Sequence, residues 1–290
     1  AKPEHWERDP LKQIEQNGYF FGRRTQDLKG EISLITATFL RLKSEGFVPT
    51  RDLIIAFTGD EETQMDTARE LATKYRALTD AEFALNGDGG GGSLDSSTGK
   101  PQYYKVQGAE KSYASFTLTA HNPGGHSSQP RPDNAIYELA DALKALQGYS
   151  FPIMWNEWTL GSFKASAPVT PGELGEAMAK FAAHPGDAGA AAILAKAPAM
   201  IGRTRTTCVA TLLTGGHADN ALPQSATATV NCRIFPGTSV AEVRDSLQQV
   251  VGDRIEVQVL GEPHSSPPSP LRDDVLEAVT RAVRASHPGV

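Results

Sequence analysis

The chain has 290 residues, of which 39% are hydrophobic and 21% charged, and its formal net charge is −6. Such a chain can bury one or two substantial cores, so we expect a folded protein of two domains. The acidic balance, without a Lys/Arg-rich block, argues against a nucleic-acid partner. No apolar run has the length of a membrane span, so we expect a soluble chain with no membrane partner, cytoplasmic or, if a leader precedes it, periplasmic or secreted.

The first part of the chain alternates helices and apolar strands. Apolar residues recur every three or four positions over residues 28–46 and predict a helix that ends at Gly46. The continuous apolar run at 53–57 predicts a buried strand, a second helix is expected over 65–75, and a short strand over 82–85. This order is typical of a parallel α/β layer.

Carboxylates follow both predicted strands. Glu61 and Glu62 come after the first strand, Asp88 comes after the second, and Asp27 precedes the first helix. Because the carboxyl ends of parallel strands lie at one edge of a sheet, we expect these groups to converge there. Carboxylates that lie close together repel one another unless a cation lies among them, so the sequence predicts a metal site.

Each candidate residue also has a simpler interpretation. Asp27 and the acidic residues at 60–62 are typical of helix N-termini, and Asp88 with its glycines is typical of a turn. By themselves, His126 would be a solvated loop residue and Arg233 a surface cation. Only the ordered combination of these residues favours a functional site.

A second domain is predicted after a turn region at 93–101. Strands are expected at 113–120, 206–214, 225–234 and 255–260, and helices at 134–147 and 240–251. An Ala-, Gly- and Pro-containing stretch at 151–203 is expected to be helical around 173–181. Without this stretch the order is β-α-β-β-α-β, that of a ferredoxin-like sandwich. A Pro-rich linker and a final helix follow, so we predict domain segments at 1–107, 108–263 and 264–290, with the middle one inserted into the first.

Cys208 and Cys232 are the only cysteines, too few for a disulfide framework or a thiolate metal cluster. They fall on neighbouring predicted strands, so a bond between them is conceivable. The usual burial of cysteine favours two free thiols, which is our expectation, and the compartment stays open.

Other catalytic motifs fail on inspection. The glycines at 89–92 are not followed by the Gly-Lys-Ser/Thr of a phosphate-binding loop, and Gln129 stands where a nucleophile elbow needs its second glycine. No His-Glu-x-x-His occurs. Nucleotide binding and serine hydrolysis are therefore disfavoured.

Five motifs occur in order along the chain. They are Gly-Arg-x-x-x-Asp-x-Lys-Gly at 22–30, Thr-Gly-Asp-Glu-Glu at 58–62, Asn-Gly-Asp-Gly-Gly at 86–90, Gly-Gly-His-Ser-Ser at 124–128, and Asn-x-x-Pro at 220–223 leading to Arg233. Together they resemble the aminoacylase/carboxypeptidase-G family of co-catalytic zinc metallopeptidases, which includes succinyl-diaminopimelate desuccinylase and carnosinase-type dipeptidases. The resemblance implies a parallel-sheet α/β catalytic domain with an inserted lid that forms a homodimer.

The resemblance also implies roles for the acidic residues and the histidine of these motifs. Asp27 matches the carboxylate that bridges two zinc ions, Glu62 a ligand of one zinc ion, and Asp88 a ligand of the other. Glu61 matches the general base that takes a proton from the bridging water. His126 matches the lid histidine that reaches the partner subunit's active site and stabilises the oxyanion.

The implied substrate is a small peptide or an N-acyl amino acid. Arg233, with Asn220 nearby, matches the groups that hold the substrate carboxylate, and the planar guanidinium suits this task. The implied cofactor is zinc, two ions per complete subunit, with cobalt or manganese as substitutes because carboxylate and imidazole sites accept them as well.

Two histidine segments of the family pattern are missing. The family needs a His-x-Asp segment before the bridging aspartate and a histidine near the C-terminus, whereas only His5 and His287 occupy these regions. We therefore expect the chain to be incomplete at both ends and inactive alone. The alternative is a non-catalytic relative, a dimeric protein that binds partners. The retention of all four carboxylates favours the enzyme.

Overall fold

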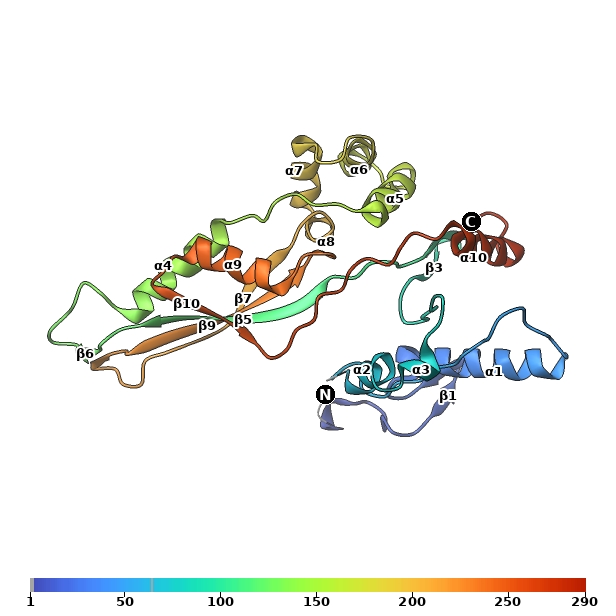
Figure 1. Cartoon of the computed structure of the whole chain (residues 1–290), viewed down its shortest axis with the longest axis horizontal. Coiled ribbons are helices and arrows are strands. Elements are labelled where there is room, and N and C mark those ends of the chain that lie inside the picture. Colours follow the sequence, from blue (N-terminus) through green and yellow to red (C-terminus); the bar gives the residue numbers. More distant parts are fainter. Residues whose placement is uncertain (1–2, 64) are drawn as a thin grey trace. The chain divides into compact units, whose positions relative to one another are not determined.

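The computed structural model describes residues 3–63 and 65–290. The chain forms two compact units (Figure 1). Unit 1 comprises the described residues up to Val106 together with Ala282–Val290, and unit 2 comprises Gln107–Arg281. No helix among the described residues is long and apolar enough to cross a membrane.

Unit 2 is built on a four-stranded antiparallel sheet with the strand order β10-β5-β9-β7. These strands are β5 (Ser112–His121), β7 (Thr207–Gly215), β9 (Ser225–Ile234) and β10 (Ile255–Leu260). The helices α4 (Ala135–Gly148) and α9 (Val240–Val251) pack on one face of the sheet and enclose the main hydrophobic core with it. With these helices, the chain order is β-α-β-β-α-β, as expected from the sequence.

Local sequence signals explain these elements. Side chains of β5 alternate between buried and more exposed positions, so that Phe116 and Leu118 face the helices. The Asn134 side chain caps α4 by accepting a hydrogen bond from the Ile136 N–H at 2.8 Å. Ser239 and Glu242 form a capping box at the start of α9.

A helical subdomain lies between α4 and β7 in the chain. It consists of α5 (Glu157–Ser166), η3 (Ala167–Val169), α6 (Glu173–Ala183), α7 (Ala188–Lys196) and α8 (Pro198–Ile201). It has its own apolar core around Phe163 and Phe181, whose rings lie edge to face at 5.8 Å. The segment is more helical than the sequence analysis predicted.

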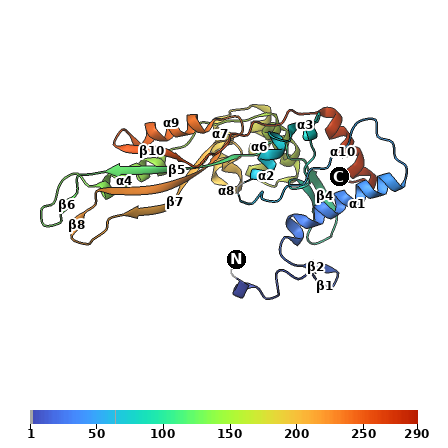
Figure 2. The same ribbon diagram turned by 60° about the horizontal axis from the view of Figure 1, so that its bottom comes forward.

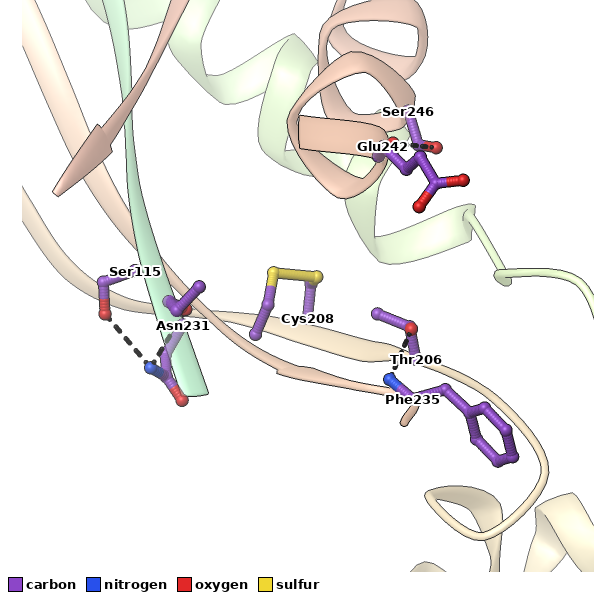
Figure 3. Close-up of a disulfide and its surroundings, with 9 residues drawn as sticks. Ser115, Thr206, Cys208, Asn231, Phe235, Glu242 and Ser246 are labelled. Atoms are coloured by element: carbon purple, nitrogen blue, oxygen red, sulfur yellow. Dashed lines mark hydrogen bonds between the residues drawn. A yellow bond between two sulfur atoms is a disulfide. The ribbon is translucent and has the colours of Figure 1, made fainter. Parts of the chain in front are cut away.

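Cys208 and Cys232 form a disulfide (Figure 3), so the expectation of two free thiols is wrong. The register of β7 and β9 places the two residues directly opposite each other, with 4.1 Å between their Cα atoms. Residues opposite each other in a ladder share a face of the sheet, which brings the two sulfur atoms together. Nearby, the Thr206 hydroxyl accepts a hydrogen bond from the Phe235 N–H.

Unit 1 contains two small hairpins and several helices. The hairpins are β1 (Ile14–Gln16) with β2 (Tyr19–Phe21) and β3 (Gly91–Leu94) with β4 (Pro101–Lys105); the second replaces the turn region expected at 93–101. The helices are η1 (Pro3–His5), η2 (Thr25–Lys29), α1 (Gly30–Ser44), α2 (Asp66–Ala72) and α3 (Arg76–Thr79). A last helix, α10 (Asp273–Ser286), crosses the boundary of the two units in sequence.

The parallel sheet predicted for unit 1 is not formed by the described residues. Neither 53–57 nor 82–85 is a strand there, and Leu53 and Phe57 are 46% and 50% exposed. A strand needs a hydrogen-bonded neighbour along its length, and no ladder in the described part of the chain includes either segment. The two segments nevertheless begin side by side, because Arg51 and Glu82 form an ion pair at 3.0 Å.

Candidate active site

Asp27 lies in the irregular turn η2 that leads into α1. Its backbone departs from helical geometry, with φ −116° and ψ 92°, and the Asp27–Leu28 peptide bond is cis. The turn is held by the Thr25 hydroxyl, which donates to the Gly22 carbonyl at 2.7 Å, and by the Lys29 ammonium, which donates to the Arg23 carbonyl at 3.3 Å. Asp27 therefore does not cap α1, and its carboxylate is left for another partner.

The acidic run at 60–62 divides into one capping residue and two that do not cap. The Asp60 carboxylate accepts hydrogen bonds from the Asp66 N–H at 2.7 Å and the Thr67 N–H at 3.1 Å, at the start of α2. Hydrogen bonding, above all from the Thr67 hydroxyl, lowers the pKa of Asp60. The helix-cap interpretation thus holds for Asp60, which leaves Glu61 and Glu62 exposed on the turn.

The side chains of Glu62 and Asp27 meet. They share a hydrogen bond, and this bond raises the pKa of Glu62 above its ordinary value. The negative charges of Asp27, Glu61 and Asp88 raise this pKa further, so all of these carboxyl groups lie within electrostatic range of Glu62. Three acidic side chains therefore gather around Glu62, and two of them, Asp27 and Asp88, come from parts of the sequence distant from it.

Asp88 is held in a tight turn close to the start of α1. The Asn86 side chain accepts a hydrogen bond from the Asp88 N–H at 3.1 Å, as in an Asx turn. A Cβ atom at Gly87 would lie 2.3 Å from Cγ of Glu31, in the first turn of α1. The Asp88 turn therefore lies against the Glu31 side chain, which would have to move if residue 87 carried a side chain of its own.

The donor set fits a divalent cation by its chemistry. The hydrogen bond with Asp27, followed by repulsion from the neighbouring carboxylates, raises the pKa of Glu62, and a cation among these groups would relieve the repulsion. The geometry of a complete site is not assembled, because in residues 3–63 and 65–290 no three His, Cys, Asp or Glu side chains lie close enough to hold a metal ion. The described residues thus provide a carboxylate cluster rather than a finished coordination sphere.

His126 lies in unit 2, on the two-residue strand β6 (Gly125–His126), which pairs with β8 (Ala221–Leu222). Its Nδ1 accepts a hydrogen bond from the Ser128 N–H at 3.2 Å and lies 2.8 Å from the Ser128 hydroxyl. The neutral imidazole therefore carries its proton on Nε2. The ring is exposed, so this N–H is available to a ligand.

Asn220 and Arg233 lie at opposite ends of the β9 strand, which corrects the expectation that Asn220 lies near Arg233. The Asn220 carbonyl accepts a hydrogen bond from the Ser127 N–H at 3.0 Å, beside His126 and before β9 begins. Arg233 lies at the far end of β9, which starts at Ser225. At about 3.4 Å per residue, about 27 Å of strand separates Ser225 from Arg233. Figure 2 shows β6 and β8 at the end of unit 2 that is remote from α6, α7 and α8.

Two residues beside Arg233 were missed by the sequence analysis. The Arg233 guanidinium lies over the Tyr113 ring, 4.9 Å from its centre. The pairing of β5 with β9 places these two residues opposite each other. Burial, with a smaller effect of the Arg233 charge, lowers the pKa of Lys111 to about 8. These residues come together through the register of β5 and β9, which cannot be predicted from the sequence before the sheet is known.

The chain matches the peptidase dimerisation domain of M20 proteins over residues 108–257, more than half of its length. It is 30% identical over 274 residues to N-fatty-acyl-amino acid synthase/hydrolase PM20D1 of Xenopus tropicalis, covering 93% of this chain and 53% of that protein. It is 24% identical over 284 residues to succinyl-diaminopimelate desuccinylase of Halorhodospira halophila, covering 97% of this chain and 62% of that protein.

Among solved structures, human carnosine dipeptidase 1 matches with a TM-score of 0.55 and 16% identity, over 98% of this chain and 63% of that one. At this identity the likeness concerns the fold alone. The chain spans about half to two thirds of the length of the proteins that it matches here. These matches confirm the resemblance carried by the five motifs: the chain belongs to the M20 peptidase family.

Proposed function

We propose that this chain carries catalytic residues of a metal-dependent amidohydrolase that cleaves a small peptide or an N-acyl amino acid. The observation that carries the proposal is the contact of the Glu62 and Asp27 carboxyl groups, with Glu61 and Asp88 within electrostatic range. A cluster of this kind costs energy unless a cation compensates it. The relatives support the substrate class, since one is named as a fatty-acyl-amino acid hydrolase and another as a desuccinylase.

In this proposal Asp27, Glu62 and Asp88 hold the metal, with zinc as the first candidate and cobalt or manganese as substitutes. When bound there, zinc would lower the pKa of water and polarise the scissile carbonyl. Glu61 is adjacent to Glu62 in sequence and is not itself a ligand. It takes the proton of the attacking water and passes it to the amide nitrogen as the C–N bond breaks.

Unit 2 supplies the groups that recognise the substrate and the developing charge. The Nε2–H of His126 donates a hydrogen bond to the oxyanion, the task for which its tautomer is suited. Arg233 binds the terminal carboxylate through its guanidinium. Because Arg233 and His126 lie at opposite ends of the β9 strand, a small substrate cannot contact both of them in one protomer.

Because Arg233 and His126 are so far apart in one protomer, we infer a symmetric homodimer. In this dimer the end of unit 2 that carries His126 and Asn220 completes the site of the other copy. The strand β7 offers a contact surface for this dimer. It is an edge strand with exposed apolar side chains, among them Leu212 at 66% and Leu213 at 67%. An edge of this kind is a ready template for pairing with a second copy.

The experiment is an amide screen with the protein expressed from its complete gene. Zinc-loaded protein is incubated with dipeptides, N-succinyl, N-acetyl and long-chain N-acyl amino acids, and products are identified by mass spectrometry. We expect release of a free amino acid from at least one class, abolished by chelation. A protein that binds zinc and these ligands yet hydrolyses none of them would instead fit the dimeric binding protein.

A further inference from the structure

The loop of residues 122–134 joins β5 to α4 and carries His126. We propose that Asn122, Arg131 and Asp133 form a clamp across the base of this loop and act as positioning residues for the His126 imidazole. The inference rests on the proposed function for its catalytic consequence. Its structural part stands on contacts within unit 2.

Asn122 fixes the start of the loop. It is 9% exposed, and its N–H donates to the Gln224 carbonyl at 2.9 Å, which ties it to the chain just before β9. Its side-chain oxygen accepts a hydrogen bond from the Gly124 N–H at 3.0 Å. Its side-chain nitrogen donates to Oδ2 of Asp133 at 3.0 Å. One buried residue therefore joins the chain beside β9, the start of the loop and its end.

Arg131 and Asp133 form an ion pair at the end of the loop that leads into α4. Nε of Arg131 donates to Oδ1 of Asp133 at 3.0 Å and Nη2 donates to Oδ2 at 2.8 Å, a two-pronged charged contact. This contact lowers the pKa of Asp133 to about 2. Cδ of Arg131 lies 4.0 Å from the position of a Cβ on Gly125, the residue before His126. The arginine stem thus lies against the backbone that carries the histidine.

The tip of the loop is ordered by different contacts. Ser128 sets the imidazole tautomer, and the Gln129 N–H donates to the His126 carbonyl at 2.9 Å. These bonds lie within the loop, so they orient the ring relative to the loop backbone. The pairing of β6 with β8 ties the backbone at the tip to a neighbouring segment, and the clamp ties the base of the loop to the chain beside β9. Both are needed for the Nε2–H to point in one direction.

A purely stabilising role explains the clamp less well. The Arg131 and Asp133 side chains are 43% and 36% exposed, and ion pairs with such exposure contribute little to stability. A displacement of about 1 Å in a catalytic group can instead cost about 100-fold in rate. The clamp is therefore expected to affect turnover far more than folding.

The test is a double-mutant cycle in the protein expressed from its complete gene, at zinc saturation. We expect Asp133→Ala to lower kcat by about 10- to 100-fold with a much smaller change in KM. Arg131→Lys keeps the charge, loses the fork and gives a smaller loss in kcat. The matched control is Asp141→Ala, at an exposed aspartate within α4, and it leaves kcat unchanged. In a His126→Ala background, Asp133→Ala should cause no further loss.

Amide hydrogen exchange supplies a second measurement that does not depend on turnover. Asp133→Ala should speed exchange at Gly124 and Ser127, while the amides of β9 keep their wild-type rates. An unchanged kcat, a loss that persists in full without His126, or unchanged exchange at both amides would overturn the clamp. A wild-type protein with no amidase activity, but with the expected change in exchange, would support the clamp and overturn the proposed function.

Discussion

The carboxyl group of Glu62 is hydrogen-bonded to that of Asp27, although the two residues lie on different turns of unit 1. The contact gathers the acidic motifs at 22–30 and 58–62 at one place. Two carboxyl groups can share such a bond only while one of them keeps a proton, which is why the pKa of Glu62 is raised. A metal ion that takes the place of this proton is the core of the proposed mechanism.

The first prediction follows from this competition between proton and metal. The pKa of Glu62 is raised from its ordinary value of 4.5, so zinc affinity should rise with pH until the raised pKa is passed. Without metal the folded state holds this proton more tightly than the unfolded state, so its contribution to stability is present at low pH and lost as pH rises through the raised pKa. Calorimetric zinc titrations between pH 4.5 and pH 7 check the first effect, and thermal unfolding in chelator checks the second.

Glu62→Gln serves as the comparison for this pH dependence. The amide cannot ionise, so the variant should bind zinc more weakly and with a flatter pH profile than the wild type. Equal profiles for the two proteins would remove Glu62 from the metal site.

Glu61→Gln should abolish turnover while the metal content stays at the wild-type value, because the proposed base is not a ligand. The expected loss in kcat is on the order of 10²–10⁴. Metal analysis and kinetics on the same preparation check both parts, with Glu70→Gln on α2 as the matched control. Loss of the metal, or near-normal turnover, would speak against Glu61 as the base.

The edge strand β7 should carry the dimer contact. Leu212→Lys places a charge at an apolar side chain that is 66% exposed, and in a dimer this charge would be buried without a partner. Light scattering should report twice the chain mass for the wild type and a shift toward one chain mass for the variant. Val169→Lys, at a residue 68% exposed in η3, is the control and should leave the mass unchanged. A dimer that survives Leu212→Lys would locate the contact elsewhere.

The disulfide between Cys208 and Cys232 should stabilise unit 2. It closes a loop with a sequence separation of 24, for which chain entropy gives about 3 kcal/mol. Reduction should lower the wild-type melting temperature, whereas the Cys208→Ala/Cys232→Ala double variant should melt lower in both conditions and not respond to reductant. A melting temperature that reductant does not change, with the bond shown by mass analysis to be broken, would contradict this.

The sequence predicted unit 2 better than unit 1, for a physical reason. Period-two alternation and helix caps are local signals, so β5, α4 and α9 fall within a residue or two of their expected bounds. The strand expected at 53–57 was inferred from an apolar run alone, and a strand also needs a neighbour that local sequence does not specify. The disulfide and the Arg233–Tyr113 contact depend on strand register, which is a property of the assembled sheet.

In the candidate site, too, the sequence predicted the identity of the residues better than the contacts that they make. The motifs named each acidic residue, but they did not reveal that Asp60 is occupied in capping α2, nor that Asn220 lies at the His126 end of unit 2. They also said nothing of Asn122 and Asp133, which meet only because the loop folds back on itself.

If Asp27, Glu62 and Asp88 hold a metal on which amide hydrolysis depends, removal of the metal should abolish activity and its return should restore it. Protein expressed from its complete gene is stripped with chelator, titrated with zinc, and assayed at each step for bound metal and for hydrolysis of the best substrate found in the screen. We expect activity to return in proportion to bound zinc, and we expect Asp27→Asn and Asp88→Asn to bind less zinc and to recover no activity. Hydrolysis that survives complete removal of metal, or full recovery by both variants, would contradict it.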